Sequence, residues 1–167
     1  MDRLLISVLG NRNAGKSRTW NTLFGRTVRT GKEERVLEVA KNVFVDVFLA
    51  SGSPEERDLY VGDILKNSKA RIVLCSVQYI PGATRTFDYF INAGFNIYVH
   101  WINPGYHDSG PAPDSLGLLN NLLYRQAIVA IRDGKVPADS RARELREFIH
   151  GWAHSRGLTR SLGITSP

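Results

Sequence analysis

The chain alternates between nearly continuous apolar runs and segments whose apolar side chains recur every three or four positions. The continuous runs cover residues 3–9, 43–49, 70–79 and 96–103 and are typical of strands buried on both faces of a parallel sheet. The periodic segments cover residues 17–24, 84–93 and 140–156 and predict helices that each turn one face toward a core. Strands and helices in alternation predict an α/β fold.

One pair of strands is expected to run antiparallel. Residues 36–39 and 43–49 are β-rich, and the polar residues Lys41 and Asn42 lie between them. A connection this short joins antiparallel strands, because a parallel pair needs a crossover of about a dozen or more residues. We therefore expect a β-hairpin here.

Two later segments carry weaker signals. Residues 53–56 read SPEE and combine a capping serine, a first-turn proline and a glutamate three residues after the cap, which predicts a helix over residues 54–67. Residues 127–131 are all apolar and either extend the helix predicted over residues 115–126 or form a sixth strand. No turn signal separates them from the leucines before them, which favours the helix.

Length and composition describe one domain. The 167 residues are 43% hydrophobic and 23% charged, values typical of a globular protein with a buried core. We expect this domain to cover residues 1–157 and a C-terminal tail to cover residues 158–167. No apolar run approaches the roughly 20 residues that span a bilayer, and no charged-then-apolar leader is present, which predicts a cytoplasmic protein without a membrane span. Cys75 is the single cysteine, so a disulfide framework is excluded.

The net charge of +6 permits an anionic partner but does not choose among nucleic acid, a membrane surface and an acidic protein. Basic residues are densest over residues 132–160, where acidic residues are interleaved with them. Such interleaving is more typical of a solvated helix face than of a nucleic-acid groove.

The strongest functional signal is the segment from Gly10 to Ser17, which fits the phosphate-loop pattern GxxxxGK[ST] and directly follows the first apolar run. Glycines let the backbone wind tightly so that successive N–H groups point at phosphate oxygens, and the start of the next helix adds a partial positive charge. Lys16 would place its ammonium group near the β- and γ-phosphates, and Ser17 would hold Mg²⁺ through its hydroxyl. The predicted phosphate-binding residues are Gly10, Asn11, Arg12, Asn13, Ala14, Gly15, Lys16, Ser17 and Arg18.

With this loop after the first strand, the elements predict the three-layer sandwich of a phosphate-loop NTPase: a mostly parallel sheet of five or six strands with one antiparallel hairpin strand. The polar residues 26–34 then form either a switch segment or a solvated connection. As a switch they would bring Thr27 or Thr30 to Mg²⁺, and Thr30 fits better because Gly31 follows it. Asp46 is the only acid in the strand that follows, which makes it the candidate for a second metal-binding side chain.

Residues 10–25, GNRNAGKSRTWNTLFG, resemble the first motif of the Era-like and TrmE-like GTPases, which runs roughly G-x-P-N-x-G-K-S-x-L-x-N-x-L-x-G. The likeness covers this segment alone and includes Asn13, Asn21, Leu23 and the closing glycine. It implies a small GTPase-like protein that binds GTP with Mg²⁺. In some members an asparagine at the position of Asn13 coordinates K⁺, which neutralises charge during phosphoryl transfer. An asparagine can equally well fix the backbone of the loop.

Two further motifs of that family are altered. Where Asp-x-x-Gly is expected after the third strand, residues 49–52 read LASG, so the glycine is present and the aspartate is absent. Residues 100–104 read HWINP in place of the guanine-reading Asn-Lys-x-Asp, which removes the basis for a strict preference for guanine and leaves GTP and ATP both open. The base-binding candidates are Trp101, Asn103, Tyr106 and Asp108. The candidates for sensing the γ-phosphate or orienting water are Gly52, Gln78 and His100.

Three functions fit these observations. The first is a GTPase-like NTPase that signals to a protein partner. The second is a nucleotide or small-molecule kinase with its acceptor site in residues 104–114; the predicted hairpin argues against it, and the altered guanine and aspartate motifs argue for it. The third is a module that binds nucleotide without hydrolysis and docks a protein or a nucleic acid through residues 132–160.

Overall fold

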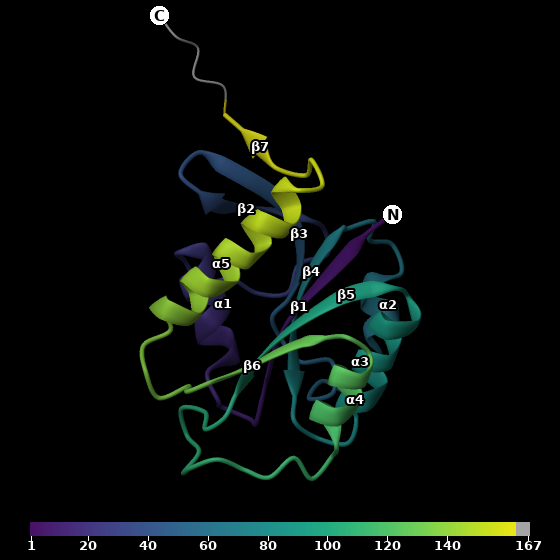
Figure 1. The fold of residues 1–167 in the computed structure, drawn as a ribbon, viewed down its shortest axis with the longest axis vertical. Helices are drawn as coiled ribbons and strands as arrows, with labels where there is room; N and C mark the ends of the chain where they lie inside the picture. Colours follow the sequence, from purple (N-terminus) through teal and green to yellow (C-terminus); the bar gives the residue numbers. More distant parts are fainter. Residues whose placement is uncertain (163–167) are drawn as a thin grey trace, which may run out of the picture.

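The computed structural model describes residues 1–162 and contains one mixed sheet with helices on both faces (Figure 1). The strands are β1 (Arg3–Gly10), β2 (Arg35–Ala40), β3 (Val43–Ala50), β4 (Ile72–Gln78), β5 (Phe95–Ile102), β6 (Ile128–Arg132) and the short β7 (Arg160–Ser161). Their order across the sheet is β2-β3-β4-β1-β5-β6, and β7 pairs with β3 outside this path. Neighbouring strands from β3 to β6 pair in parallel, whereas β2 and β7 run antiparallel to β3. The predicted α/β fold and hairpin are confirmed.

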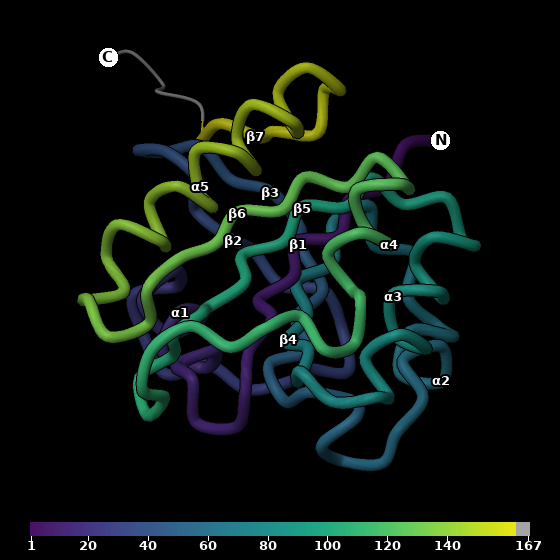
Figure 2. The backbone as a smooth tube through the Cα atoms, turned by 60° about the horizontal axis from the view of Figure 1, so that its bottom comes forward, coloured from purple at the N-terminus to yellow at the C-terminus, as the bar shows by residue number. Residues whose placement is uncertain are grey.

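The helices are α1 (Lys16–Phe24), α2 (Val61–Leu65), α3 (Ala83–Asn92), α4 (Leu118–Tyr124) and α5 (Asp139–His154). Figure 2 shows α1 and α5 on one side of the strands and α2, α3 and α4 on the other. The described residues therefore form three layers: two helices, the sheet, and three helices.

The apolar run of β1 is explained by its central place in this sandwich. Leu4 and Ile6 belong to the core cluster that includes residues of α1 and α5, whereas Leu5 and Leu9 belong to the cluster that includes residues of α2, α3 and α4. Each of these four side chains is at most 1% exposed. Successive side chains of a strand point to opposite faces, so a strand covered on both faces needs apolar residues at every position.

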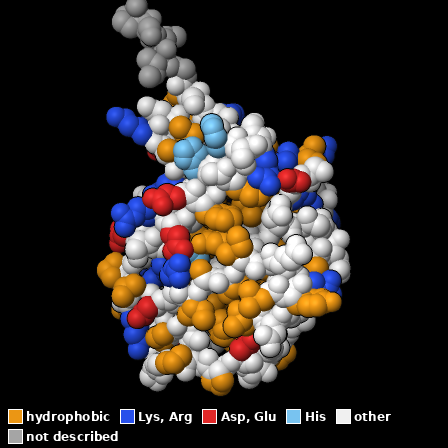
Figure 3. Space-filling view, viewed as in Figure 1, with side chains coloured by type: hydrophobic (Ala, Val, Ile, Leu, Met, Phe, Trp, Pro, Cys, Tyr) orange, Lys and Arg blue, Asp and Glu red, His pale blue; other side chains and the backbone are white. Residues whose placement is uncertain are grey.

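The helix favoured for residues 127–131 was wrong, because this segment forms β6. Gln126 adopts a positive φ of 61°, which ends the preceding helix, and the next residues pair in parallel with β5. As an edge strand, β6 leaves Ile128 and Ile131 each 51% exposed. Figure 3 shows hydrophobic side chains gathered on the face of the molecule that carries β6 and α4. The continuous apolar pattern of residues 127–131 thus belongs to a partly exposed edge strand and not to a buried helix.

The helix predicted over residues 54–67 was also wrong in extent, since only Val61–Leu65 forms α2. The backbone of Asp58 takes a positive φ of 51°, and the N–H of Leu59 donates to the carbonyl of Pro54 at 2.8 Å, so the chain closes a turn instead of continuing as a helix. The predicted serine cap is not made, because the buried Oγ of Ser53 has no hydrogen-bond partner among the described residues.

Part of the segment expected to be a C-terminal tail lies against the domain. Leu158 packs on the core cluster beside α1 and α5, and β7 pairs with residues 43 and 44 of β3. The rest of that expected tail, residues 163–167, lies outside the described residues. Over residues 1–162, none of the helices combines the length and the apolar character that crossing a membrane requires.

The parallel strands place their following loops at one edge of the sheet. β1, β3, β4 and β5 all run in the same direction, so the segments after Gly10, Ala50, Gln78 and Ile102 emerge side by side. In open α/β sheets this carboxyl edge is where ligands bind. β4 lies between β1 and β3, and the segment after β3 therefore reaches the glycine-rich loop across one intervening strand.

Candidate functional site

A cavity of about 380 Å³ lies at the carboxyl edge of the sheet. Three segments that are far apart in the sequence line it: the glycine-rich loop with the start of α1, the segment after β3, and the loop after β5. The lining residues are Asn13, Ala14, Gly15, Lys16, Ser17, Arg18, Ser51, Gly52, Ser53, Glu56, Tyr106 and His107. The structure thus brings most of the predicted phosphate-binding residues together with Gly52 and Tyr106.

The glycine-rich loop turns tightly before α1. Asn13 and Gly15 both have positive φ values, 61° and 106°, and the N–H of Ala14 donates to the carbonyl of Asn11 at 3.1 Å. A positive φ near 106° is strained for any residue with a Cβ, which accounts for the glycine before Lys16. Among residues 1–162, no side chain caps the start of α1. The first N–H groups of this helix therefore remain available to an anion in the cavity.

Lys16 is held on the loop that precedes it. Its ammonium group donates to the carbonyls of Gly10 at 3.1 Å and Asn11 at 2.7 Å, and only 7% of the residue is exposed. Burial lowers the pKa of Lys16, whereas the carboxylates of Glu56, Glu55 and Asp108 act in the opposite direction. The cation is thus positioned by carbonyl oxygens, which a phosphate oxygen could replace as acceptor.

Glu56 provides the carboxylate in this cavity. It is exposed, lines the cavity together with Ser17, and forms an ion pair with Arg12, whose Nε lies 3.4 Å from Oε1 of Glu56. Sequence reasoning assigned Glu56 to a helix cap and so missed it. The signal that pointed to it was its position four residues after Gly52, in the segment that follows the third strand.

Asp46, the predicted second metal-binding residue, lies elsewhere. It sits in the middle of β3, its side chain is 52% exposed, and Oδ1 accepts a hydrogen bond from Arg160 at 2.5 Å. It does not line the cavity that contains Ser17. Asp46 therefore does not take the predicted metal-binding position, because a side chain in mid-strand cannot reach the carboxyl edge where the loop lies.

The predicted switch segment contacts the rim of the cavity. The hydroxyl of Thr30 accepts a hydrogen bond from the N–H of Gly52 at 3.2 Å, and the N–H of Gly31 donates to the carbonyl of Leu49 at 3.2 Å. Thr30 does not itself line the cavity, and Thr27 is exposed. The structure therefore links the candidate metal-binding threonine to Gly52 rather than to Ser17.

Two of the three catalytic candidates lie outside the cavity. Gln78 ends β4 beside Gly10, its N–H donates to Glu55, and its buried Oε1 has no partner among the described residues. His100 is fully buried in β5, where its Nε2 lies 3.3 Å from the hydroxyl of Tyr98 and 3.5 Å from Oε1 of Glu144. Burial lowers the pKa of His100 to about 4, so the ring is neutral near pH 7. His100 belongs to a buried polar cluster, not to the site.

Three of the four base-binding candidates are committed to other contacts. Trp101 is buried and stacks on Tyr79 with ring centroids 5.2 Å apart. Both polar atoms of the Asn103 side chain bond to the backbone of Ala112. Asp108 Oδ2 accepts hydrogen bonds from the Asn11 side chain and from the N–H of Gly105, each at 3.1 Å. Asp108 therefore ties the loop after β5 to the glycine-rich loop.

Tyr106 is the base-binding candidate that faces the cavity. It is 47% exposed, and its N–H donates to the carbonyl of Ala14 at 2.9 Å, which fixes the backbone beside the loop. The guanidinium of Arg18 lies over its ring at 4.6 Å from the centroid. The planar guanidinium lies over the face of the Tyr106 ring, so a planar group can pack against this face. Gly105 permits this close approach, because a Cβ there would overlap Ala14.

Three of the seven basic residues over residues 132–160 form ion pairs with acidic side chains. Arg132 contacts Glu144, Arg156 contacts Asp2, and Arg160 contacts Asp46. Figure 3 shows charges of both signs along the face that carries α5. The predicted interleaving of charge over residues 132–160 is therefore observed, and these contacts leave fewer cations free for a phosphate backbone.

Acidic and metal-binding side chains do not form a metal site by themselves in the described part of the chain. Within residues 1–162 there is no group of three or more His, Cys, Asp or Glu side chains close enough to hold a metal ion. Magnesium in nucleotide sites is commonly held by one or two protein ligands together with phosphate oxygens and water. Ser17 and Glu56 are the residues of this cavity that fit such a role.

Comparisons with known proteins add no assignment. No protein-family model matches this chain, and no curated protein matches it. The likeness of residues 10–25 to the Era-like and TrmE-like GTPases therefore stays a prediction, while the α/β fold with its mostly parallel sheet is established by the strand pairing.

Proposed function

We propose that the cavity binds a purine nucleoside triphosphate with Mg²⁺ and that the protein is a small, divergent phosphate-loop NTPase of the GTPase-like kind. One observation carries this proposal: Lys16 and Ser17, at the uncapped start of α1, line one cavity, which has Tyr106 among its other lining residues. Phosphate binds helix N-termini of this kind through backbone N–H groups.

The triphosphate would lie along the loop. Its terminal phosphates would accept hydrogen bonds from the first N–H groups of α1 and replace the carbonyl contacts of Lys16. Arg12 of the loop does not line the cavity, but it pairs with Glu56, which does, and so adds positive charge at the rim of the cavity. These cations offset the charge that develops on the phosphate during transfer to water.

Magnesium would be held by Ser17 together with phosphate oxygens. Glu56 would act through bound water, in place of the aspartate that the family motif has after the third strand. K⁺ is a second candidate cation, and Asn13 supports it because this residue lines the cavity in the middle of the loop.

The base would stack on Tyr106, displacing the guanidinium of Arg18 from the ring. Asp108 is bonded to Asn11 and Gly105, so its contacts do not favour the paired hydrogen bonds that select guanine. We therefore expect GTP and ATP to bind with affinities within about tenfold of each other.

The test is binding and turnover of MgGTP and MgATP, each with K⁺ or with Na⁺. Lys16→Ala should weaken binding of both nucleotides by about tenfold or more, because a charge-assisted contact to phosphate contributes on the order of 1.5–3 kcal/mol. Lys66→Ala, an exposed lysine outside the cavity, is the matched control. Failure of the wild-type protein to bind either nucleotide contradicts the proposal. Release of phosphate that K⁺ accelerates supports a GTPase-like activity, and binding without release supports a module that only holds nucleotide.

A nucleotide or small-molecule kinase is the second candidate, and Glu55 favours it. Its carboxylate bonds to the N–H of Gln78 and to the Thr86 hydroxyl, and it lines a separate cavity of about 140 Å³ beside Arg85. Burial raises the pKa of Glu55, and Lys16 is close enough to oppose that shift. A carboxyl group so placed could accept a proton from an acceptor hydroxyl. Nucleotide turnover that needs an added alcohol or nucleotide acceptor, and that Glu55→Gln abolishes, would assign this function instead.

A further inference from the structure

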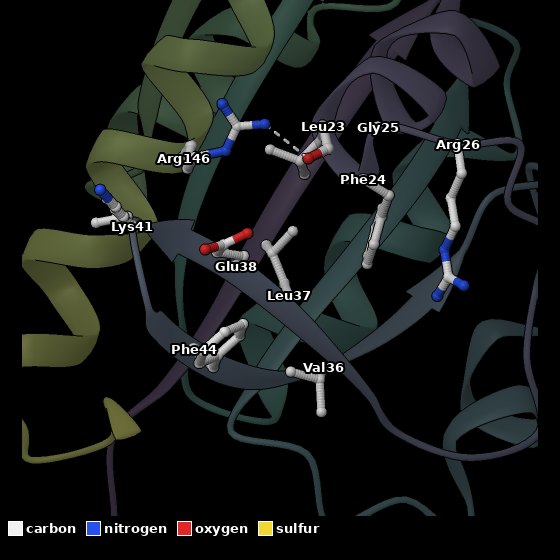
Figure 4. Close-up of a pocket in the computed structure, with 11 residues that line it drawn as sticks. Leu23, Phe24, Gly25, Arg26, Val36, Leu37, Glu38, Lys41, Phe44 and Arg146 are labelled. Carbon is white, nitrogen blue, oxygen red and sulfur yellow. Dashed lines mark hydrogen bonds between the residues drawn. The ribbon is translucent and has the colours of Figure 1, made fainter. Parts of the chain in front are cut away.

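A groove lies away from the proposed nucleotide site. It has a volume of about 660 Å³ and runs between the C-terminal end of α1 and strand β2, with Arg146 of α5 at its side (Figure 4). Phe24 from α1, Val36 from β2 and Phe44 from β3 are among its apolar lining residues. The side chain of Arg146 reaches across from α5 and donates to the carbonyl of Leu23 at 2.8 Å. This hydrogen bond joins α5 to α1 at the wall of the groove.

One side of the groove is the free edge of the sheet. In the described residues β2 pairs with β3 alone, so the backbone groups on its other side have no strand partner. Val36 is 50% exposed, whereas Leu37 is only 2% exposed. An extended segment recognises such an edge by continuing the hydrogen-bond ladder, and alternate side chains then face the groove.

The charge around the groove has one dominant sign. Arg26, Lys41 and Arg146 line it, and Glu38 is the single acid among its lining residues. The carboxylate of Glu38 already accepts a hydrogen bond from the N–H of Asn42 at 3.0 Å. An anionic partner is therefore complementary to this surface.

A neighbouring cation increases this excess of positive charge. The guanidinium of Arg35, the first residue of β2, lies 5.9 Å from the centre of the Phe24 ring. Burial lowers the pKa of Arg35, and the positive charge of Arg26 lowers it further. Arg26 and Arg35 repel each other, and a carboxylate placed between them would lower their electrostatic energy.

We propose that this groove binds an extended acidic segment of a partner protein, which adds a strand to the free edge of β2. Its apolar side chains would pack against Phe24 and Val36, and its carboxylates would pair with Arg26 and Lys41. Backbone hydrogen bonds to β2 supply affinity, and the alternation of acidic and apolar side chains supplies specificity. The groove and the nucleotide cavity have no lining residue in common, so the acidic segment and the proposed nucleotide would occupy separate sites.

The probe is a short blocked peptide of alternating glutamate and valine, titrated into the full chain and followed by calorimetry and by backbone amide NMR shifts. The largest shifts are expected at residues 35–40. The double variant Arg26→Glu, Lys41→Glu should weaken binding by about tenfold or more, since both side chains are exposed and two charge pairs become repulsive. Arg143→Glu, an exposed arginine of α5 outside the groove, is the matched control and should change the affinity by less than about twofold.

Several outcomes overturn the proposal. One is equal binding of a lysine–valine peptide, and another is binding of the acidic peptide that the double variant leaves unchanged. Binding of a short DNA or RNA duplex, lost in the double variant while the acidic peptide never binds, makes the surface a nucleic-acid site instead. A dimer in light scattering that the double variant disrupts makes it a self-association site. Lys16→Ala should bind the peptide like the wild type, so a failure of nucleotide binding is distinguishable from a failure here.

Discussion

The backbone N–H of Gly52 donates a hydrogen bond to the hydroxyl of Thr30 at 3.2 Å. This bond joins the polar segment 26–34 to the segment after β3, and Gly52 itself lines the cavity that contains Ser17. The two residues are 22 positions apart and come together because the hairpin of β2 and β3 returns the chain to the same edge. A ligand that moves Gly52 would therefore also move Thr30.

Thr30→Val tests whether this bond holds the loop in place. Valine keeps the shape of threonine but removes the acceptor, so amide hydrogen exchange at Gly52 should become about fivefold faster, as expected for the loss of about 1 kcal/mol of local stability. Thr30→Ser keeps the hydroxyl and should retain the slower exchange. An unchanged exchange rate at Gly52 in Thr30→Val would contradict the role of this hydrogen bond.

The reassignment of the metal carboxylate from Asp46 to Glu56 makes a paired prediction. Glu56→Gln should raise the Mg²⁺ concentration needed for half-maximal nucleotide binding by about tenfold, a typical effect for a group that orients metal-bound water. Asp46→Asn should leave it unchanged and cost less than about 1 kcal/mol of stability, because the ion pair with Arg160 is exposed. Titrations of Mg²⁺ at fixed nucleotide concentration measure the Mg²⁺ requirement of both variants. Equal effects of the two substitutions on this requirement would contradict the proposed role of Glu56.

The buried His100 predicts loss of stability in mild acid. Its pKa falls from 6.5 to about 4 on burial, so the unfolded chain binds a proton at a higher pH than the folded protein does. The free energy of unfolding should therefore decrease as the pH falls from about 6.5 toward 4, by at most about 1.4 kcal/mol per pH unit. Hydrogen bonding to Arg132 lowers the pKa of Glu144 to about 2, so the loss associated with that carboxylate comes only below about pH 4.5.

Urea unfolding between about pH 7 and pH 4.5 measures this dependence. His100→Gln removes the titrating group, so the free energy of unfolding of this variant should change less between about pH 7 and pH 4.5 than that of the wild type. This holds even if the variant is less stable at pH 7. A slope identical to that of the wild type would show that another group is responsible.

Gly105 is predicted to be irreplaceable for steric reasons. A Cβ at this position would overlap Ala14 of the glycine-rich loop, so Gly105→Ala should destabilise the protein by about 1–3 kcal/mol, a typical cost of overpacking. Gly151→Ala is the control: it lies in α5, its added Cβ meets nothing within 4 Å, and it should stabilise the protein by about 0.5–1 kcal/mol. Thermal unfolding of both variants measures the difference, and a neutral Gly105→Ala would contradict the close approach of the two loops.

The local features of the chain were predictable because they depend on neighbouring residues. Continuous apolar runs identify strands such as β1 that are covered on both faces, and the Lys41-Asn42 turn identifies the hairpin. The GxxxxGK[ST] pattern identifies the loop, since its backbone conformation is set by its own glycines. The predictions of a helix over residues 54–67 and over residues 127–131 were wrong because Asp58 and Gln126 adopt positive φ values. Neither residue type predicts such a backbone conformation strongly.

The sequence by itself determined that this is an α/β chain with a glycine-rich loop between its first strand and first helix. Only the tertiary structure decided which carboxylate shares the cavity with Ser17, that His100 and Trp101 are buried, and that Asp108 bonds to Asn11. It also decided that β4 lies between β1 and β3 and that, within residues 1–162, β2 is left with a free edge. These facts depend on which distant segments meet at one edge of the sheet. Strand order and loop packing determine which segments come together there. The periodicity of apolar residues along the chain encodes neither of them.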